Sequence, residues 1–521
     1  MSGKPNILFV MADQLAASFL PAYGHPLVKA PNIDRLAEAG TIFEQAYTAS
    51  PLCAPARMTM MAGRLANRIG AYDNAADFPS DVPTFAHLLR RAGYRTALAG
   101  KMHFCGADQL HGFEERLTSD IYPADYGWTA NWDNSEERPT WYHDMSSVAH
   151  AGPVVRSNQL DFDEEVGFAA RRFIYDAARD GDERPFCLVV SFTHPHDPYA
   201  ILPAYWNLYR EDEIDLPATP TRDPVEQDPH SRRCLGVYQA DIHPPSEMEI
   251  RRARRAYYGA ISYVDDQLGE LLAALKDCGL ERDTAVVFTA DHGDMLGERG
   301  LWYKMTFFDH SARVPLIVSF PGQIRPRREA RCVSLLDLMP TLAGLTGADE
   351  TRQIDWEIEA RSLIPHLSGG TGHDEAIGEY MGEGAIAPMV MIRRGSTKFV
   401  HCPADPDQLY DLAEDPQERN NLAGMPEQAT RLSAFRAEVA RRWDLEQIHE
   451  QVLSSQRRRR AIYRAQSEGA RRPWDFQPYR DASTTYMRNH RDLGDLERRS
   501  RIDAGEAGVG REEKEPVRQH G

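Results

Sequence analysis

The stretch PNILFVMAD, residues 5–13, is a short apolar run that ends in a carboxylate. Three further runs have the same form, each followed by side chains able to do chemistry: YRTALAG (94–100) before Lys101 and His103, FCLVVSFT (186–193) before His194 and His196, and TAVVFTA (284–290) before Asp291 and His292. Such runs are typical of strands covered on both faces. Helical patterns between them, such as 30–40 and 82–93, open with proline and close with glycine. The alternation predicts an α/β fold, a mostly parallel central sheet flanked by helices.

The polar ends of these four runs indicate a site. In parallel sheets, ligands bind beyond the carboxyl ends of the strands. A single aspartate after a strand is more often a helix cap, but four polar endings together predict an active site at this edge. Asp13, Asp291 and His292 offer carboxylate oxygens and one imidazole, which suit a hard divalent cation such as calcium, magnesium or manganese.

Composition excludes several classes of protein. The net charge of −18 argues against a nucleic-acid-binding protein, and no apolar run is long enough to span a membrane. The N-terminus lacks the features of a signal peptide, so we expect a cytoplasmic protein. Seven scattered cysteines without a CxxC pair favour reduced thiols over disulfides or a zinc-thiolate site.

The 521 residues suffice for two lobes and an arm. We expect a catalytic α/β domain over 1–374 and a smaller C-terminal α+β subdomain over 375–452, containing a hairpin and a helix at 428–443. Residues 453–497 turn polar and arginine-rich with interspersed aromatics, which predicts an arm that packs on the body or on another subunit, and hence a homo-oligomer, a dimer or a tetramer. The tail at 498–521 is expected to be disordered.

The stretch SPLCAPAR, residues 50–57, places a cysteine at a predicted helix start. Pro55 can open the helix, whose positive end and Arg57 would stabilise an anion at Cys53. The residues leave three interpretations open: an inert buried thiol, a thiolate nucleophile, or the precursor of another group. Two of the seven lysines, Lys101 and Lys304, fall beside suspected site segments, where each would suit one oxyanion oxygen.

Six motifs follow one another over residues 5–320: PNILFVMADQ, CAPARMTMMAGR, AGKMHF, FTHPHDPY, TADHGDMLGE and KMTFFDHSARVPL. In these motifs and in their order, the chain resembles the sulfatase family of the alkaline-phosphatase superfamily. The resemblance implies that a formylglycine-generating enzyme oxidises Cys53 to formylglycine, whose hydrate is the nucleophile. It implies a divalent metal, with calcium favoured, held by Asp13, Cys53, Asp291 and His292. Gln14 stands where many members have a second aspartate and is a further candidate ligand.

The same resemblance implies roles for the remaining site residues. Arg57 and Lys101 would hold the aldehyde hydrate, and His103 would be the base for its second hydroxyl. His196 and Lys304 would bind sulfate oxygens and assist the leaving group, whereas His194 is expected to be structural.

Within the family, the chain is most similar to choline sulfatases, through SPLCAPAR, YDNAADF and a match that extends to PWDFQP and YMRNH in the arm. The quaternary ammonium of choline must be held by aromatic faces and carboxylates. The segment DIYPADYGWTANW (120–132), here called the aromatic loop, supplies Tyr122, Tyr126, Trp128 and Trp132. The resemblance assigns the contact with the cation to Trp128, with Asn74 and Glu383 as polar partners, and Tyr126 is a further candidate from the loop. After RNH those enzymes have an acid that reaches a neighbouring pocket, where this chain has Gly494 between Asp492 and Asp495.

Three functions follow from this pattern. The first is hydrolysis of choline sulfate to choline and sulfate. The second is a phosphonate monoester or phosphodiester hydrolase that uses the same formylglycine site, and the third is a non-catalytic anion-binding protein. The full set of candidate catalytic residues argues against the third.

Overall fold

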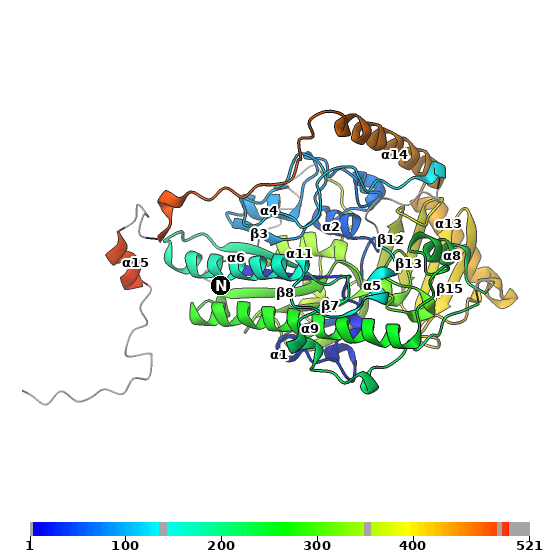
Figure 1. Ribbon diagram of the computed structural model, residues 1–521, viewed down its shortest axis with the longest axis horizontal. Coiled ribbons are helices and arrows are strands. Elements are labelled where there is room, and N and C mark those ends of the chain that lie inside the picture. Colours follow the sequence, from blue (N-terminus) through cyan, green and yellow to red (C-terminus); the bar gives the residue numbers. More distant parts are fainter. Residues whose placement is uncertain (1–3, 135–142, 224–225, 348–355, 487–491, 500–521) are drawn as a thin grey trace, which may run out of the picture.

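A computed structural model describes residues 4–134, 143–223, 226–347, 356–486 and 492–499 (Figure 1). Its centre is a sheet of nine strands in the order β11-β2-β10-β8-β1-β6-β3-β4, with β9 paired to β2. The strands are β1 (Asn6–Asp13), β2 (Thr41–Tyr47), β3 (Arg95–Gly100), β4 (Glu115–Arg116), β6 (Phe186–Pro195), β8 (Thr284–Ala290), β9 (Arg313–Val314), β10 (Leu316–Ser319) and β11 (Arg327–Ser334). The four apolar runs are β1, β3, β6 and β8, which confirms the predicted strands.

The middle of the sheet is parallel. β1 lies between β6 and β8, with Ile7 opposite both Cys187 and Ala285, and β3 continues the parallel order beyond β6. Only β9 and β10 run antiparallel to their neighbours in this sheet as described. Residues 7–12 of β1 are fully buried, as expected for a central strand covered on both faces. The predicted mostly parallel α/β fold is confirmed.

Helices cover both faces of the sheet. On one face lie α1 (Pro31–Ala39), α6 (Asn158–Arg179) and α9 (Glu247–Asp277), and on the other lie α2 (Cys53–Ala62), α4 (Phe85–Arg91) and α11 (Leu338–Leu345) (Figure 1). α9 begins at a capping box, in which Ser246 and Glu249 satisfy each other's backbone N–H groups. Its apolar stripe from Ile261 to Leu275 is buried, so the helix is held by packing on the sheet.

A smaller lobe follows the main sheet. It has the antiparallel strands β12 (Glu375–Tyr380), β13 (Met389–Arg394), β14 (Thr397–Cys402) and β15 (Asp405–Asp411), covered by α13 (Ala429–Arg442). The predicted hairpin is β13–β14, and the helix predicted at 428–443 is α13. β12 packs beside β11 of the main sheet, so the two lobes share a contact.

The arm begins with α14 (Leu445–Ser467), a helix that runs through residue 452, where we placed the end of the smaller lobe. An extended segment follows, and α15 (Leu493–Arg499), which carries Gly494 and Asp495, lies apart from the body (Figure 1). The part of the tail from 500 to 521 lies outside the described residues. Across the described ranges, no helix combines the length and apolarity needed to cross a membrane.

Candidate active site

The parallel strand ends bring the predicted site residues together. β8, β1, β6 and β3 are neighbours, so the residues that follow them share one edge of the sheet. Each of these polar side chains is at most 3% exposed: Asp13, Lys101, His103, His196, Asp291, His292 and Lys304. Gln14 and His103, with φ angles of 63° and 56°, adopt left-handed backbone conformations. Such conformations in residues other than glycine cluster at functional sites.

Glycine at the end of β3 allows Lys101 to enter this cluster. Gly100 has a φ of 103°, and a Cβ there would lie 2.1 Å from the carbonyl oxygen of Ser191. The same carbonyl accepts a 3.0 Å hydrogen bond from the Lys101 N–H. The Lys101 ammonium then donates to the carboxylate of Asp13 and lies 4.2 Å from the ring centroid of Tyr122.

Cys53 is the first residue of α2 and faces the strand ends. Its Sγ lies 3.1 Å from Nε2 of His292 and 3.9 Å from Oδ1 of Asp13. Burial alone would raise the pKa of this thiol, but Lys101, Lys304 and His292 lower it well below its ordinary value. The positive end of α2 acts in the same direction. The position therefore favours an anionic group, whether thiolate or oxyanion.

Arg57, one turn further along α2, joins the metal-ligand candidates to the strands. Its Nε donates to Oδ2 of Asp291 at 2.8 Å, and its Nη2 lies 3.6 Å from Oδ2 of Asp13. Its Nη1 donates to Oγ of Ser191 at 2.8 Å and to the carbonyl of Lys101. Burial opposes ionisation of Asp291, but Arg57 and His292 hold the pKa of its carboxyl below the usual range.

Four side chains form a donor set for a metal ion. Ligand atoms of Asp13, Cys53, Asp291 and His292 all lie within 4.8 Å of one another, and all four residues are buried. Burial and the neighbouring Asp291 raise the pKa of Asp13, a repulsion that a bound cation would relieve. Two carboxylates, an imidazole and an oxygen in place of sulfur fit a hard divalent cation.

Gln14 is directed away from this donor set. Its Oε1 accepts a 2.6 Å hydrogen bond from Nζ of Lys304, and its Nε2 donates to Oδ2 of Asp294 at 2.8 Å and to Oδ1 of Asp197 at 3.3 Å. Lys304 also lies 2.9 Å from Nε2 of His196. The candidate sulfate-binding residues Lys304 and His196 thus lie side by side, and Gln14 positions one of them.

The aromatic loop places two of its rings beside His103. Trp128 meets His103 edge to face at a centroid distance of 5.6 Å, and Tyr122 meets His103 at 5.0 Å. Tyr122 and Trp128 contact each other at 4.9 Å. An aromatic wall therefore borders the candidate catalytic base.

The other candidate substrate-binding residues, Asn74, Glu383 and Tyr126, lie on three separate segments and have different partners. Asn74 is buried, and its Oδ1 accepts a 3.0 Å hydrogen bond from the Ala54 N–H at the start of α2. Glu383 is buried in the turn after β12, next to Gly382, whose carbonyl accepts from Nε1 of Trp132. The ring of Tyr126 contacts Trp474 of the arm at 5.2 Å, so it lies apart from the Tyr122–Trp128 pair.

Sequence reasoning missed residues that support the site without touching Cys53. Asp120 accepts the backbone N–H groups of Met102 and His103 at 2.9 Å each and fixes the segment after β3. Asp197 lies 2.9 Å from Nδ1 of His143 and 3.2 Å from Nδ1 of His196. Both aspartates occur in motifs that we quoted, but neither Asp120, which precedes isoleucine, nor Asp197, which precedes proline, carries a sequence signal of its partner. His194 contacts Asp163 at 2.7 Å, a structural interaction.

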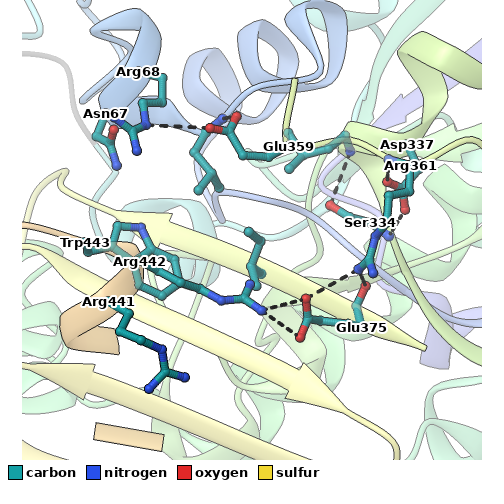
Figure 2. A pocket seen from close by; sticks show the side chains of 13 residues that line it. Asn67, Arg68, Ser334, Asp337, Glu359, Arg361, Glu375, Arg441, Arg442 and Trp443 are labelled. Carbon is teal, nitrogen blue, oxygen red and sulfur yellow. Dashed lines mark hydrogen bonds and ion pairs between the residues drawn. The ribbon is translucent and has the colours of Figure 1, made fainter. Parts of the chain in front are cut away.

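A separate cavity of about 390 Å³ lies between the two lobes (Figure 2). Most of its charged lining residues are paired with one another: Arg68 with Glu359, and Arg361 and Arg442 with Glu375. The lining contains none of the strand-end residues. We therefore place the chemistry at the strand ends.

Comparisons with known proteins agree with this geometry. The sulfatase family model matches residues 5–348, the model described as "Choline sulfatase enzyme C terminal" matches 450–502, and that of the N-sulphoglucosamine sulphohydrolase C terminus matches 297–443. A choline-sulfatase of Rhizobium meliloti is 47% identical over 97% of this chain and 100% of its own length. An arylsulfatase of Clostridium perfringens is 26% identical over 83% of this chain and 93% of its own.

Solved structures show the same architecture. A phosphonate monoester hydrolase of Agrobacterium radiobacter matches with a TM-score of 0.68 and 25% identity, covering 86% of this chain and 96% of its own. A 2-O glycosaminoglycan sulfatase matches with a TM-score of 0.65 and 24% identity over 89% of this chain and 94% of its own. With a family model over most of its length and a near-full-length relative at 47% identity, the chain belongs to the sulfatase family and is a sulfatase enzyme.

Proposed function

We propose that the enzyme hydrolyses choline sulfate to choline and sulfate, with a nucleophile made from Cys53. The observation that carries this proposal is the aromatic wall of Tyr122 and Trp128 beside His103, next to Cys53. A quaternary ammonium binds to aromatic faces because their quadrupole attracts a cation that cannot form hydrogen bonds. The relative named choline-sulfatase supports the same substrate.

The nucleophile proposed is the hydrate of formylglycine formed by oxidation of Cys53. It supplies one oxygen for attack on sulfur and a second hydroxyl whose deprotonation releases sulfate. Cys53 is 1% exposed, so a formylglycine-generating enzyme would have to act before the chain has folded around it. A calcium ion, with manganese or magnesium as alternatives, would be held by Asp13, Asp291, His292 and position 53, and would supply positive charge near the developing oxyanion.

The chain's own residues complete this chemistry. Arg57 and Lys101 hold position 53 against the strand ends. Burial lowers the pKa of His103, so its imidazole is neutral near pH 7 and can accept the proton of a hydroxyl. Lys304 and His196 lie together to bind sulfate oxygens and to protonate the departing choline oxygen.

A phosphonate monoester hydrolase is the second candidate. It is favoured by the structural match to such an enzyme at 25% identity. It would use the same buried nucleophile but would have no need for an aromatic wall beside the base. The Tyr122–Trp128 pair therefore favours the choline ester.

One experiment separates these functions. Enzyme produced together with a formylglycine-generating enzyme is assayed for sulfate release from choline sulfate and for hydrolysis of a phosphonate monoester, with Cys53→Ala as the inactive control. We expect choline sulfate to have the higher kcat/KM and intact-protein mass to show conversion of Cys53. A higher kcat/KM for the phosphonate would refute the substrate, and full activity with an unmodified Cys53 would refute the nucleophile.

A further inference from the structure

The geometry points to Arg459, on helix α14 of the arm, as a positioning residue that sets specificity by holding together the two segments that carry Asn74 and Trp128. This inference rests on the proposed function, because both residues are candidates for contact with the choline group. Arg459 lies outside the strand-end cluster and is 5% exposed. It belongs to the run QRRRR (456–460) of the arginine-rich arm, which we predicted to pack on the body or on another subunit.

Arg459 forms a buried fork with Asp73 and extends it to the aromatic loop. Its Nη1 and Nη2 donate to the two carboxylate oxygens of Asp73 at 2.6 and 2.8 Å. Its Nη1 also lies 3.2 Å from Oγ1 of Thr129. Paired guanidinium and carboxylate groups fix both position and angle, which a single ion contact does not.

Each partner of Arg459 adjoins a candidate substrate-binding residue. Asp73 precedes Asn74, which is tied to the start of α2 through Ala54. Thr129 follows Trp128, and the Thr129 hydroxyl donates to the carbonyl of Tyr126 at 2.8 Å. The guanidinium thus sets the distance between the Asn74 segment and the Trp128 segment without contacting a ligand itself.

The arm provides further contacts along the same loop. Gln456 accepts the Trp132 N–H at 2.9 Å, and Asp475 accepts the Ala124 N–H at 2.9 Å. The loop from 120 to 134 contains only a short 3₁₀ turn among its described residues, so its shape depends on contacts with other segments. The shape of the aromatic loop is therefore supported by its contacts with the arm.

Arg457, two residues earlier, offers a matched control. It pairs with Asp133 at 2.6 Å, but its side chain is 62% exposed and that of Asp133 is 46% exposed. Exposed pairs of this kind contribute little, whereas loss of Arg459 would leave the carboxylate of Asp73 buried without its main partner. Of the two arginine substitutions, only that of Arg459 should disturb the aromatic wall.

The substitution should affect the alcohol end of the substrate and spare the sulfate end. Sulfate is bound by residues on the strand ends, which Arg459 does not touch. For Arg459→Met we expect KM for choline sulfate to rise by on the order of tenfold, the size of a lost cation–π contact, because the Trp128 ring would be displaced from the ammonium group. KM and kcat for an aryl sulfate, whose aryl group carries no positive charge, should stay within about threefold, because that ester makes no use of a cation pocket.

The test measures KM and kcat on choline sulfate and on an aryl sulfate without a cationic group. It compares wild type, Arg459→Met, Arg459→Lys, Thr129→Val and Arg457→Met. Arg459→Lys retains charge but not the fork, so we expect an intermediate KM. Thr129→Val removes the contact between Arg459 and the aromatic loop but keeps the Arg459–Asp73 pair. Its KM for choline sulfate therefore tests the inference even if Arg459→Met does not fold. A KM rise confined to choline sulfate in the Arg459 and Thr129 variants supports the inference, and Arg457→Met should match wild type.

Two results would overturn the inference: equal losses on both esters, or unchanged preference in the Arg459 and Thr129 variants. Failure of the proposed function looks different. In that case the wild type itself would cleave the aryl sulfate and leave choline sulfate intact.

Discussion

Glu379 should make the stability of the enzyme depend on pH between about 5 and 8, a range in which most carboxylates no longer titrate. This residue of β12 is 1% exposed. Its carboxylate accepts hydrogen bonds from the Asn67 backbone N–H at 2.8 Å, from the Asn67 side chain, and from Nε1 of Trp443 at 2.6 Å. Asn67 and Trp443 line the cavity between the lobes (Figure 2). Burial outweighs these donors and raises the pKa of Glu379 from 4.5 to about 7.

The sign follows from proton binding. Between pH 4.5 and 7, the folded protein holds a proton on Glu379 that the unfolded chain has released. Folding stability is therefore highest, for this group, below pH 4.5 and falls as the pH rises through 7. A pKa change of this size corresponds to a loss of about 2 to 3 kcal/mol in the free energy of unfolding between pH 5 and pH 8.

The assay is urea unfolding of wild type and Glu379→Gln at several values between pH 5 and pH 8. Glutamine cannot titrate, so the difference in unfolding free energy between the two proteins should change by about 2 to 3 kcal/mol across the range. The absolute stability of the variant is not the test, because an amide cannot accept from all three donors. Parallel pH profiles for the two proteins would refute the reasoning.

Glu375 provides the control from the same strand. Burial opposes its ionisation, but Arg394 and Arg442 hold the pKa of Glu375 below its ordinary value of 4.5. Stability from this group is present above pH 4.5 and is lost only as the pH falls below it. Glu375→Gln should thus leave the slope between pH 5 and pH 8 unchanged.

Three further predictions concern the active site. Trp128→Ala should raise KM for choline sulfate by about tenfold or more in steady-state kinetics, while KM for an aryl sulfate without a cationic group changes little, and equal losses would argue against a cation pocket. Arg57→Lys should lower kcat/KM about 100-fold on both esters, since a lysine cannot contact Asp291, Ser191 and the Lys101 carbonyl at once. Near-normal activity in that variant would contradict the role of Arg57. Dialysis against a chelator should abolish activity, calcium, manganese or magnesium should restore it, and Asp291→Asn should reduce the metal content measured by elemental analysis.

The position of the candidate site was largely predictable because many of its residues follow strands. A buried strand has a recognisable apolar run, and the residue after it must lie at the sheet edge, so Asp13, Lys101 and Asp291 could be placed together. The antiparallel direction of β10 could not be predicted, since hydrophobic periodicity is the same in both directions. Nor could the pairing of Arg459 with Asp73, which lies 386 residues away in the chain.

The aromatic loop shows where pattern reasoning stops. Tyr122, Tyr126 and Trp128 stand close together in sequence, and all three belong to the aromatic loop that we predicted to border the substrate. In a helix or a strand, the side-chain periodicity tells which face a residue is on. An irregular loop has no such periodicity, so the sequence does not tell where each of its side chains points. The structure turns Tyr122 and Trp128 toward His103 and Tyr126 toward Trp474.

Residues that follow strands and residues on irregular segments differ in how far they can shift, and this bears on how such an enzyme could change its substrate. The groups proposed to act on sulfur are positioned by the central sheet, and a shift in them would disturb a buried network of Arg57, Asp13 and Asp291. The groups proposed to contact the alcohol stand on irregular segments around 74, 128 and 383, and the first two are held by the arm through Arg459. Substitutions in the arm can therefore reshape the alcohol pocket while the strand-end chemistry stays intact.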